Sequence, residues 1–199
     1  MSKEASISNP PILDPETWVD NYGNYLYNFA LGRLRNRENA QNVVQETFLA
    51  ALSARKNFSG KSTERTWLIG ILKHKIIDAM RKSYREKPIT DVKSDEEAID
   101  QFFDRKTHMA KNMPSAWRLN PKEILENKEF WDTFKKCQEK LPQSARDAFT
   151  LREIEKISGK EICAILNITP SNFWVLLHRA RLQLRQCLEL NWFKDQENL

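Results

Sequence analysis

The chain has 199 residues, of which 40% are hydrophobic and 30% charged, and it contains 5 glycines. This length suits one large domain or two small ones, and so few glycines exclude the glycine-rich phosphate loops of nucleotide-binding enzymes. The formal net charge is +5, and residues 1–87 hold 14 Lys and Arg against 9 Asp and Glu. A local basic surplus favours a polyanionic partner such as nucleic acid, although a solvated helix face gives the same pattern.

The cysteines and the hydropathy pattern bear on the cellular compartment. Cys137, Cys163 and Cys187 are far apart and odd in number, which argues against a disulfide framework or a zinc site and favours a reducing compartment. No apolar run approaches 18 residues, and the polar start is not a signal peptide. We therefore expect a soluble, cytoplasmic protein with no cofactor, no metal and no direct membrane insertion.

Three helices are predicted before residue 88. The first begins at Asp14–Pro15, an N-cap followed by proline at the first helical position, and it runs to about Leu34. A turn at residues 36–39 leads to a second helix, whose apolar face contains Val43, Val44, Phe48, Ala51 and Leu52. After a polar loop, Thr63 caps a third helix that ends near Arg85.

The third predicted helix has an apolar stripe on one side and charges on the other. At 100° per residue, the side opposite the stripe carries Trp67, His74, Asp78, Arg81 and Arg85. Lysines at positions 73, 75 and 82 flank this side. An aromatic ring followed by cations suits a nucleic-acid strand, because cations meet phosphates and the ring stacks on a base. A half-buried tryptophan beside ordinary surface charges explains the pattern equally well.

Residues 88–120 are acidic and weakly apolar, and they are interpreted as a linker with a short helix around 99–103. The next helix begins at Asn120–Pro121 and ends before Pro142. Its expected inward side chains are Ile124, Leu125, Trp131, Phe134 and Leu141. A shorter helix follows and carries Ala145, Ala148, Phe149 and Arg152.

The last part of the chain predicts a helix-turn-helix. Ser158 and Glu161 form a capping box for a helix of about eight residues, and Thr169–Pro170 begins the next helix. Small Ala164 is expected where the two helices approach each other. The outer face of the second helix carries Ser171, Trp174, Val175, His178 and Arg185, with Arg179 and Arg181 at its sides. Plain helix packing is the commoner case, but this basic second helix favours DNA binding.

Three segments in this order resemble bacterial RNA polymerase sigma factors of the extracytoplasmic-function group. Residues 39–48 resemble the polymerase-binding helix, and residues 66–72 with 78–82 resemble the melting and minus-ten segment. Residues 141–146, 161–162 and 178–181 resemble the minus-thirty-five domain. The resemblance covers about residues 15–190 and implies a non-enzymatic, all-α promoter-recognition subunit with two helical domains and a linker.

The resemblance also implies a domain plan and partners. The expected parts are a flexible N-terminus at 1–13, a region 2-like domain at 14–87, the linker at 88–120, a region 4-like helix-turn-helix domain at 121–190 and a tail at 191–199. The implied partners are core RNA polymerase, promoter DNA as duplex and as the unpaired minus-ten strand, and an anti-sigma factor.

Site residues follow from the same resemblance. Those expected to bind core polymerase are Gln41, Asn42, Gln45, Glu46 and Phe48. Those expected at minus-ten DNA are Phe58, Lys61, Trp67, Lys73, His74, Asp78, Arg81, Lys82 and Arg85. Those expected at minus-thirty-five DNA are Ser171, Asn172, Trp174, Val175, His178, Arg179 and Arg181.

The chain departs from the family pattern at several of these positions. Gln41 and Asn42 replace an acidic pair, and His74 stands where the family often has Asn. Trp174 and Leu176 stand where Lys or Arg is common, so they either contact DNA or form an apolar patch for a protein partner.

Two rival functions are weighed against this one. A stand-alone helix-turn-helix regulator of duplex DNA explains the second domain but leaves the 41–48 segment and the Trp67-to-Arg85 face without a role. A hydrolytic nucleic-acid enzyme needs converging carboxylates or metal ligands, whereas His74, His108 and His178 are scattered.

Overall fold

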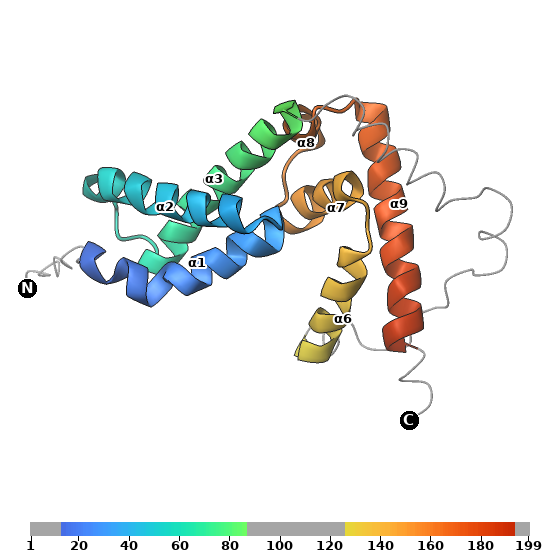
Figure 1. Cartoon of the computed structure of the whole chain (residues 1–199), viewed down its shortest axis with the longest axis horizontal. Coiled ribbons are helices and arrows are strands. Elements are labelled where there is room, and N and C mark those ends of the chain that lie inside the picture. The colour runs from blue at the N-terminus through green and yellow to red at the C-terminus, as the bar shows by residue number, and fades with distance from the viewer. Residues whose placement is uncertain (1–12, 87–125, 194–199) are drawn as a thin grey trace, which may run out of the picture. The chain divides into compact units, whose positions relative to one another are not determined.

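The computed structural model describes residues 13–86 and 126–193, and every regular element within these ranges is helical (Figure 1). The chain forms two compact units, residues 1–83 and 84–199. The prediction of an all-α chain with two helical domains is confirmed. The expected linker, its short helix and the helix start at Asn120–Pro121 lie outside the described residues. Within the described residues, no helix is both long and apolar enough to span a membrane.

The first unit contains α1 (Trp18–Leu34), α2 (Arg37–Ala54) and all but the last three residues of α3 (Glu64–Glu86). A 3-10 turn (Pro15–Thr17) precedes α1, and α1 and α2 pack side by side as an antiparallel pair (Figure 1). The helices can reverse over two residues because Arg35 takes the left-handed conformation, with φ of 51°. The side chains that fill the core include Trp18, Leu26, Ala30, Val43, Ala51, Leu68, Leu72 and Ile76.

Two helix starts differ from the sequence prediction. The Asp14 side chain makes no capping hydrogen bond, and a 3-10 turn stands where the first α-helical turn was expected. The Asp14 backbone N–H donates instead to the Glu64 carboxylate at 3.0 Å. The second helix already begins at Arg37, because the Asn36 side chain accepts a hydrogen bond from the Asn39 N–H and caps it.

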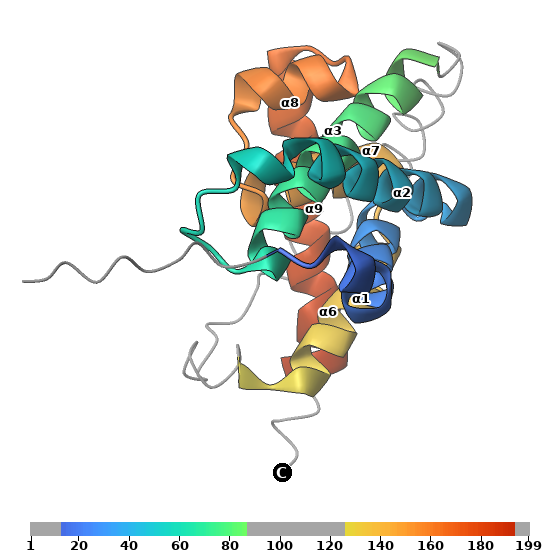
Figure 2. The ribbon, with the colours of Figure 1, turned by 90° about the vertical axis from the view of Figure 1, so that its left-hand side faces the viewer.

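The second unit contains α6 (Lys128–Glu139), α7 (Gln143–Phe149), α8 (Gly159–Leu166) and α9 (Pro170–Leu188). Short π-helical segments follow α7 (Thr150–Ile154) and α9 (Glu189–Phe193). Helix α9 is the central element, because α6, α7 and α8 all pack against it (Figures 1 and 2). Its buried side chains lie at helical spacing: Phe173, Leu176, Leu177, Ala180, Leu184 and Leu188.

The predicted helix-turn-helix is present as α8 and α9. Ser158 and Glu161 form the capping box of α8, and the Thr169 side chain accepts from the Asn172 N–H at the start of α9. The close approach of the two helices lies at Gly159 rather than at Ala164, which is exposed. A Cβ at Gly159 would lie 3.2 Å from the Phe173 ring, so the glycine permits this packing.

Two side chains expected in the core are exposed. Leu52 is 41% exposed, because the buried stripe of α2 runs through Thr47, whose hydroxyl donates to the Val43 carbonyl at 2.6 Å. Trp131 is 45% exposed, because α6 buries the neighbouring Phe130, which lies about 100° away around the helix.

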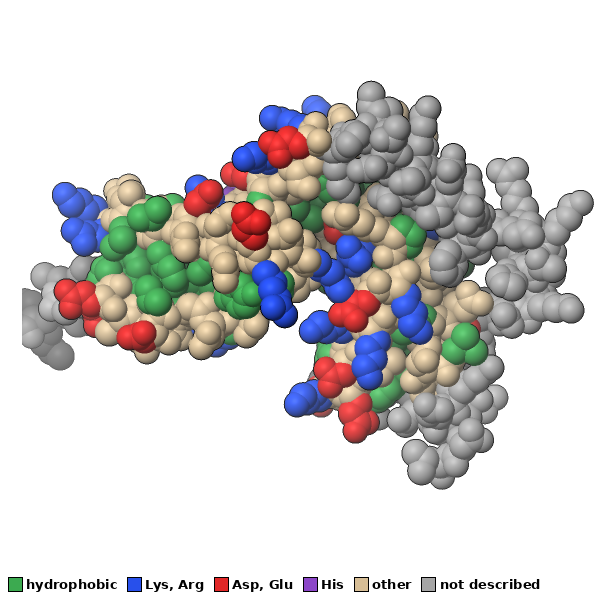
Figure 3. All heavy atoms as spheres, in the orientation of Figure 1, with side chains coloured by type: hydrophobic (Ala, Val, Ile, Leu, Met, Phe, Trp, Pro, Cys, Tyr) green, Lys and Arg blue, Asp and Glu red, His purple; other side chains and the backbone are tan. Residues whose placement is uncertain are grey.

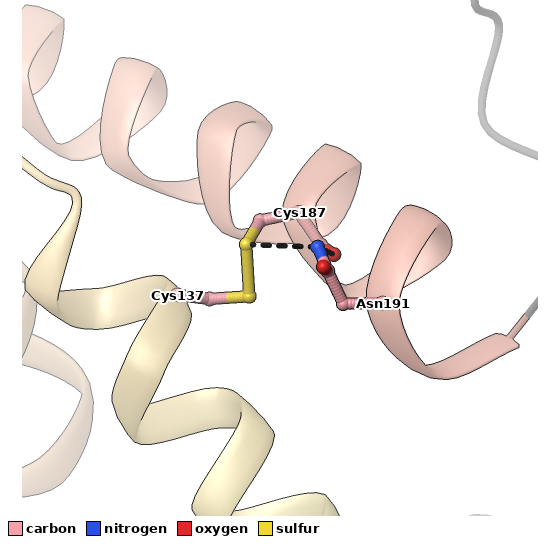
Figure 4. The surroundings of a disulfide bond; sticks show 3 residues. All are labelled: Cys137, Cys187 and Asn191. Carbon is pink, nitrogen blue, oxygen red and sulfur yellow. Dashed lines mark hydrogen bonds between the residues drawn. A yellow bond between two sulfur atoms is a disulfide. The ribbon is translucent and has the colours of Figure 1, made fainter.

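The expectation that no disulfide forms is wrong. Cys137 of α6 and Cys187 of α9 are bonded, with their Cα atoms 5.7 Å apart (Figure 4). The two cysteines are 50 residues apart in the chain, and the packing of α6 on α9 brings them together. No local sequence pattern therefore indicated this pairing. Cys163 is a free, half-buried thiol.

Candidate functional site

Helix α2 presents a polar stripe outside its core face. Gln41, Asn42, Gln45 and Glu46 are exposed, and Phe48 is half-buried. The Glu46 carboxylate lies 3.2 Å from the ammonium of Lys75 on α3. The structure therefore brings together four of the five residues predicted to bind polymerase on one accessible surface.

Two apolar side chains continue this surface: Leu49, which the sequence pattern did not single out, and Leu52, which was expected in the core. Leu49 is 64% exposed and lies four residues after Gln45, so it shares the same helix face, and exposed Leu52 follows it. In Figure 3 the surface of α1 and α2 carries a hydrophobic patch, and the exposed hydrophobic residues of α1 are Val19 and Tyr25. The spacing of Gln45, Leu49 and Leu52 is the sequence signal that marks them.

The Trp67 ring belongs to an aromatic cluster. Its centroid lies 5.0 Å from that of Phe58 and 6.0 Å from that of buried Trp18, in an edge-to-face contact with Trp18. The loop between Phe58 and α3 carries exposed Lys61. Of the predicted minus-ten residues, Phe58 and Trp67 are therefore held by packing, and only part of each ring is accessible.

Glu64, which the sequence analysis did not single out, anchors this cluster at the first turn of α3. Its Oε1 accepts hydrogen bonds from the Asp14 N–H at 3.0 Å and the Trp18 indole N–H at 2.6 Å, and its Oε2 accepts one from the Tyr22 hydroxyl at 3.0 Å. The pKa of Tyr22 is raised above its usual value. Burial is the largest cause, and the hydrogen bond to Glu64 is the second largest. No sequence signal marks Glu64, because its partners lie 42 to 50 residues earlier.

The charged face of α3 is accessible along its length. The exposed residues of the predicted set on this helix are Lys73, His74, Asp78, Lys82 and Arg85. Arg81 is half-buried and donates to the Asp78 carboxylate at 2.8 Å. Asp78 therefore positions Arg81 within the face and neutralises part of its charge.

The outer face of α9 is exposed over its first two turns. Ser171, Trp174, Val175 and His178 are exposed there. Trp174 is 57% exposed as a whole residue, and its ring packs on the buried Phe173 ring with 5.1 Å between the centroids. Asn172 and Arg179 are half-buried at the edges of this face.

Leu176 is 2% exposed, so the suggested apolar patch of Trp174 and Leu176 is wrong. Leu176 lies about 200° around α9 from Trp174 and faces the core, and the exposed apolar neighbour of Trp174 is Val175.

Acidic side chains pair with two arginines of α9. Arg181 is exposed and donates to the Glu153 carboxylate, and the Arg185 guanidinium lies 3.6 Å from a carboxylate oxygen of Glu189. Figure 3 shows Lys and Arg interspersed with Asp and Glu on the visible face of the second unit. Within residues 13–86 and 126–193, no three His, Cys, Asp or Glu side chains are grouped so as to hold a metal ion.

Known protein families account for both units. The family described as Sigma-70 region 2 matches residues 18–86, and the family described as Sigma-70, region 4 matches residues 132–184. A probable RNA polymerase sigma factor of Haemophilus influenzae is 36% identical over 160 residues, which cover 80% of this chain and 82% of that protein. The ECF RNA polymerase sigma factor SigM of Bacillus subtilis is 29% identical over 164 residues, which cover 82% and 88%.

Among solved structures, the sigma factor RpoE of Bartonella quintana, in complex with the anti-sigma factor NepR, is similar over 88% of this chain and 97% of that one. Its sequence identity to this chain is 20% and its TM-score is 0.40.

Proposed function

This chain belongs to the sigma-70 family of RNA polymerase sigma factors, in the extracytoplasmic-function group, and we propose that its two units share promoter recognition between them. The first unit binds core polymerase through α2 and holds the unpaired minus-ten strand along α3. The second unit places α9 in the major groove of the minus-thirty-five element.

One observation supports this proposal above all others: the α2 stripe is exposed in the unit that lacks the helix-turn-helix. A regulator that binds duplex DNA alone has no use for this surface, whereas a polymerase subunit requires one. Leu49 and Leu52 extend the docking surface, because exposed apolar side chains rimmed by polar ones are typical of protein interfaces.

For the minus-ten strand, we assign phosphate contacts to the cations of α3 and base contacts to the accessible edges of Phe58 and Trp67. The phosphate contacts come from Lys73, Lys82 and Arg85, with Arg81 positioned by Asp78. His74 lies on the same exposed face, and we assign it a contact to an unpaired base. Stacking of one base on an aromatic ring contributes about 1–3 kcal/mol, which helps to offset strand opening.

For the minus-thirty-five element, we assign base contacts to Ser171, Trp174, Val175 and His178 on the exposed face of α9. An indole or a valine side chain suits the C5-methyl group of thymine, which marks A·T pairs in the major groove. Asn172, Arg179 and Arg181 lie at the edges of this face, and we assign phosphate contacts to them.

The family membership also supports a regulatory partner and a compartment. We propose that an anti-sigma factor sequesters the chain and that it acts in the cytoplasm, where transcription takes place. The chain supplies recognition, and core polymerase carries out the chemistry.

The α2 assignment is tested by the double variant Gln45→Ala, Glu46→Ala. We expect its affinity for core polymerase to fall at least about tenfold, because two polar contacts are lost, while the helix stays intact because alanine favours helix. Affinity is measured by competition with a labelled sigma factor, and thermal melting reports on the fold.

Lys75→Ala is the matched control, because it breaks the ion pair with Glu46 and leaves the α2 surface unchanged. An exposed ion pair contributes less than about 1 kcal/mol, so this variant should keep its polymerase affinity. If the double variant binds core polymerase like the wild type, α2 is not the docking surface and the stand-alone regulator is favoured.

A further inference from the structure

The pairing of Cys137 with Cys187 goes beyond promoter recognition. Cys137 is 2% exposed, whereas Cys187 is half-buried in the last turn of α9. The Asn191 amide nitrogen lies 3.5 Å from the Cys187 sulfur and donates to the Cys187 carbonyl at 2.6 Å (Figure 4). Cys187 is therefore the more accessible residue of the pair and has an N–H donor beside its sulfur, whereas Cys137 lies in the interior.

We propose that Cys137 and Cys187 are a reversible thiol-oxidation site that stabilises the helix-turn-helix unit when the cell meets an oxidant. The cytoplasm, where we place the protein, keeps most thiols reduced, so the reduced pair is the resting state there. A disulfide that forms in such a compartment is usually a transient, regulatory one.

The order of the oxidation steps follows from the difference in burial between Cys187 and Cys137. The Cys187 thiolate attacks a peroxide oxygen and becomes a sulfenic acid, while the O–O bond breaks and the leaving oxygen takes a proton from solvent and departs as water or alcohol. The Cys137 thiol then condenses with it and releases a water, so two electrons pass from the two thiols to the peroxide. A small disulfide such as oxidised glutathione gives the same product by two exchange steps and leaves as two thiols.

The consequence depends on which elements the bond encloses. The loop from residue 137 to residue 187 contains α7, α8 and all but the last residue of α9. Closing a loop of this length constrains the unfolded chain and favours the folded unit. Recognition residues 171–178 precede Cys187 by 9 to 16 residues, or about 14–24 Å along the helix. Oxidation therefore changes the stability of the unit and leaves its DNA-reading face uncovered.

The test uses the full-length chain, reduced with dithiothreitol or oxidised with diamide. Peptide mapping under non-reducing conditions should find Cys137 joined to Cys187. Oxidation should raise the melting temperature of the second unit by about 10 °C or more and slow amide hydrogen exchange in α9, with α1 to α3 unchanged. In a glutathione buffer with the reduced form in excess, the bond should open.

Cys163→Ser is the matched control, because this free thiol lies on α8 inside the same unit. The Cys163→Ser variant should keep the full difference in melting temperature and hydrogen exchange between the oxidised and the reduced chain. The variants Cys137→Ser and Cys187→Ser should each lose this difference. Each variant is compared with itself in two redox states, so a general loss of stability does not affect the result. Polymerase and DNA are absent throughout, so the outcome is independent of the proposed function.

Three results would overturn the inference. Diamide could fail to join Cys137 to Cys187, or join either of them to Cys163 instead. The bonded chain could melt and exchange like the reduced chain. The bond could persist in reduced glutathione, which would make it a permanent structural bond.

Discussion

A single carboxylate connects Asp14 and the first turns of α1 to α3. Glu64 accepts hydrogen bonds from the Asp14 N–H, the Trp18 indole and the Tyr22 hydroxyl, and Trp18 is 1% exposed. Removing the acceptor of a buried N–H lowers the free energy of unfolding by about 1–3 kcal/mol. The network also fixes the Trp18 ring against which Trp67 packs, so it positions part of the proposed minus-ten surface.

Glu64→Ala should therefore lower the free energy of unfolding by at least about 1–3 kcal/mol, measured by urea denaturation. Tyr22→Phe removes one of the three hydrogen bonds and should cost only about 0.5–1.5 kcal/mol. In Glu64→Ala the pKa of Tyr22 should also move back toward its usual value, as a spectrophotometric titration would show. Equal stabilities of Glu64→Ala and the wild type would mean that water replaces the carboxylate without cost.

Trp174 is the most exposed aromatic side chain on the proposed DNA-reading face. Trp174→Ala should change which minus-thirty-five sequences are preferred, by about 1–3 kcal/mol at the contacted base pair. The measurement is selection of preferred sequences from a randomised minus-thirty-five element in the presence of core polymerase. Little stability should be lost, because Trp174 is already 57% exposed.

Trp131→Ala serves as the control, since this second exposed tryptophan of the same unit lies on α6. It should leave the selected sequences unchanged. An unchanged preference in Trp174→Ala, together with weaker binding to an anti-sigma factor, would reassign Trp174 to a protein interface.

At the scale of the element, the start of α8 has a pH-dependent cap. Glu161 accepts hydrogen bonds from the Ser158 hydroxyl and backbone N–H, and these hold the pKa of its carboxyl below the usual 4.5. Because the folded pKa is the lower one, this stabilisation is present above about pH 4.5 and is lost as the pH falls through the folded pKa.

An NMR titration of the full chain should therefore give Glu161 a pKa below 4.5, and Ser158→Ala should return it toward 4.5. Glu161→Gln keeps a capping side chain and should remove this contribution to the acid dependence of melting. A pKa that does not respond to Ser158→Ala would show that the capping box is open in solution.

Local signals in the sequence predicted most of the helices. Thr63, Ser158 and Thr169 act within one turn, so the starts of α3, α8 and α9 follow from neighbouring residues. The features that the sequence did not predict depend on packing between distant parts of the chain. The Cys137–Cys187 bond and the Glu64 hydrogen bonds join residues far apart in the chain, and no local pattern specifies them.

Side-chain exposure was harder to predict than helical structure. The exposed residues of the α9 face can be predicted from the sequence, because the apolar residues of this helix recur at clear helical spacing. The exposure of Leu52 could not be predicted in this way, because a polar residue, Thr47, takes a core position in α2 and its hydroxyl donates a hydrogen bond within the helix. Binary patterning fails wherever such a residue interrupts the stripe.

For the whole molecule, the charge balance predicts how strongly the chain binds DNA by itself. The net charge is +5, from 32 basic and 27 acidic residues, and two cations of the proposed DNA faces already pair with carboxylates: Arg81 with Asp78, and Arg181 with Glu153. Each phosphate contact contributes about −0.9 to the slope of log affinity against log salt, so the small net charge and these two ion pairs predict weak duplex binding.

The chain alone should therefore bind promoter duplex within about tenfold of its affinity for a scrambled duplex, with a shallow salt dependence. Core polymerase should convert this weak binding into heparin-resistant, promoter-specific complexes, because docking presents both units to one promoter and adds the affinity of each contact. Filter binding at several salt concentrations, with core polymerase alone as control, measures both quantities. Nanomolar specific binding by the isolated chain would instead identify it as a stand-alone duplex regulator, since such a protein needs no docking surface on α2 to find its site.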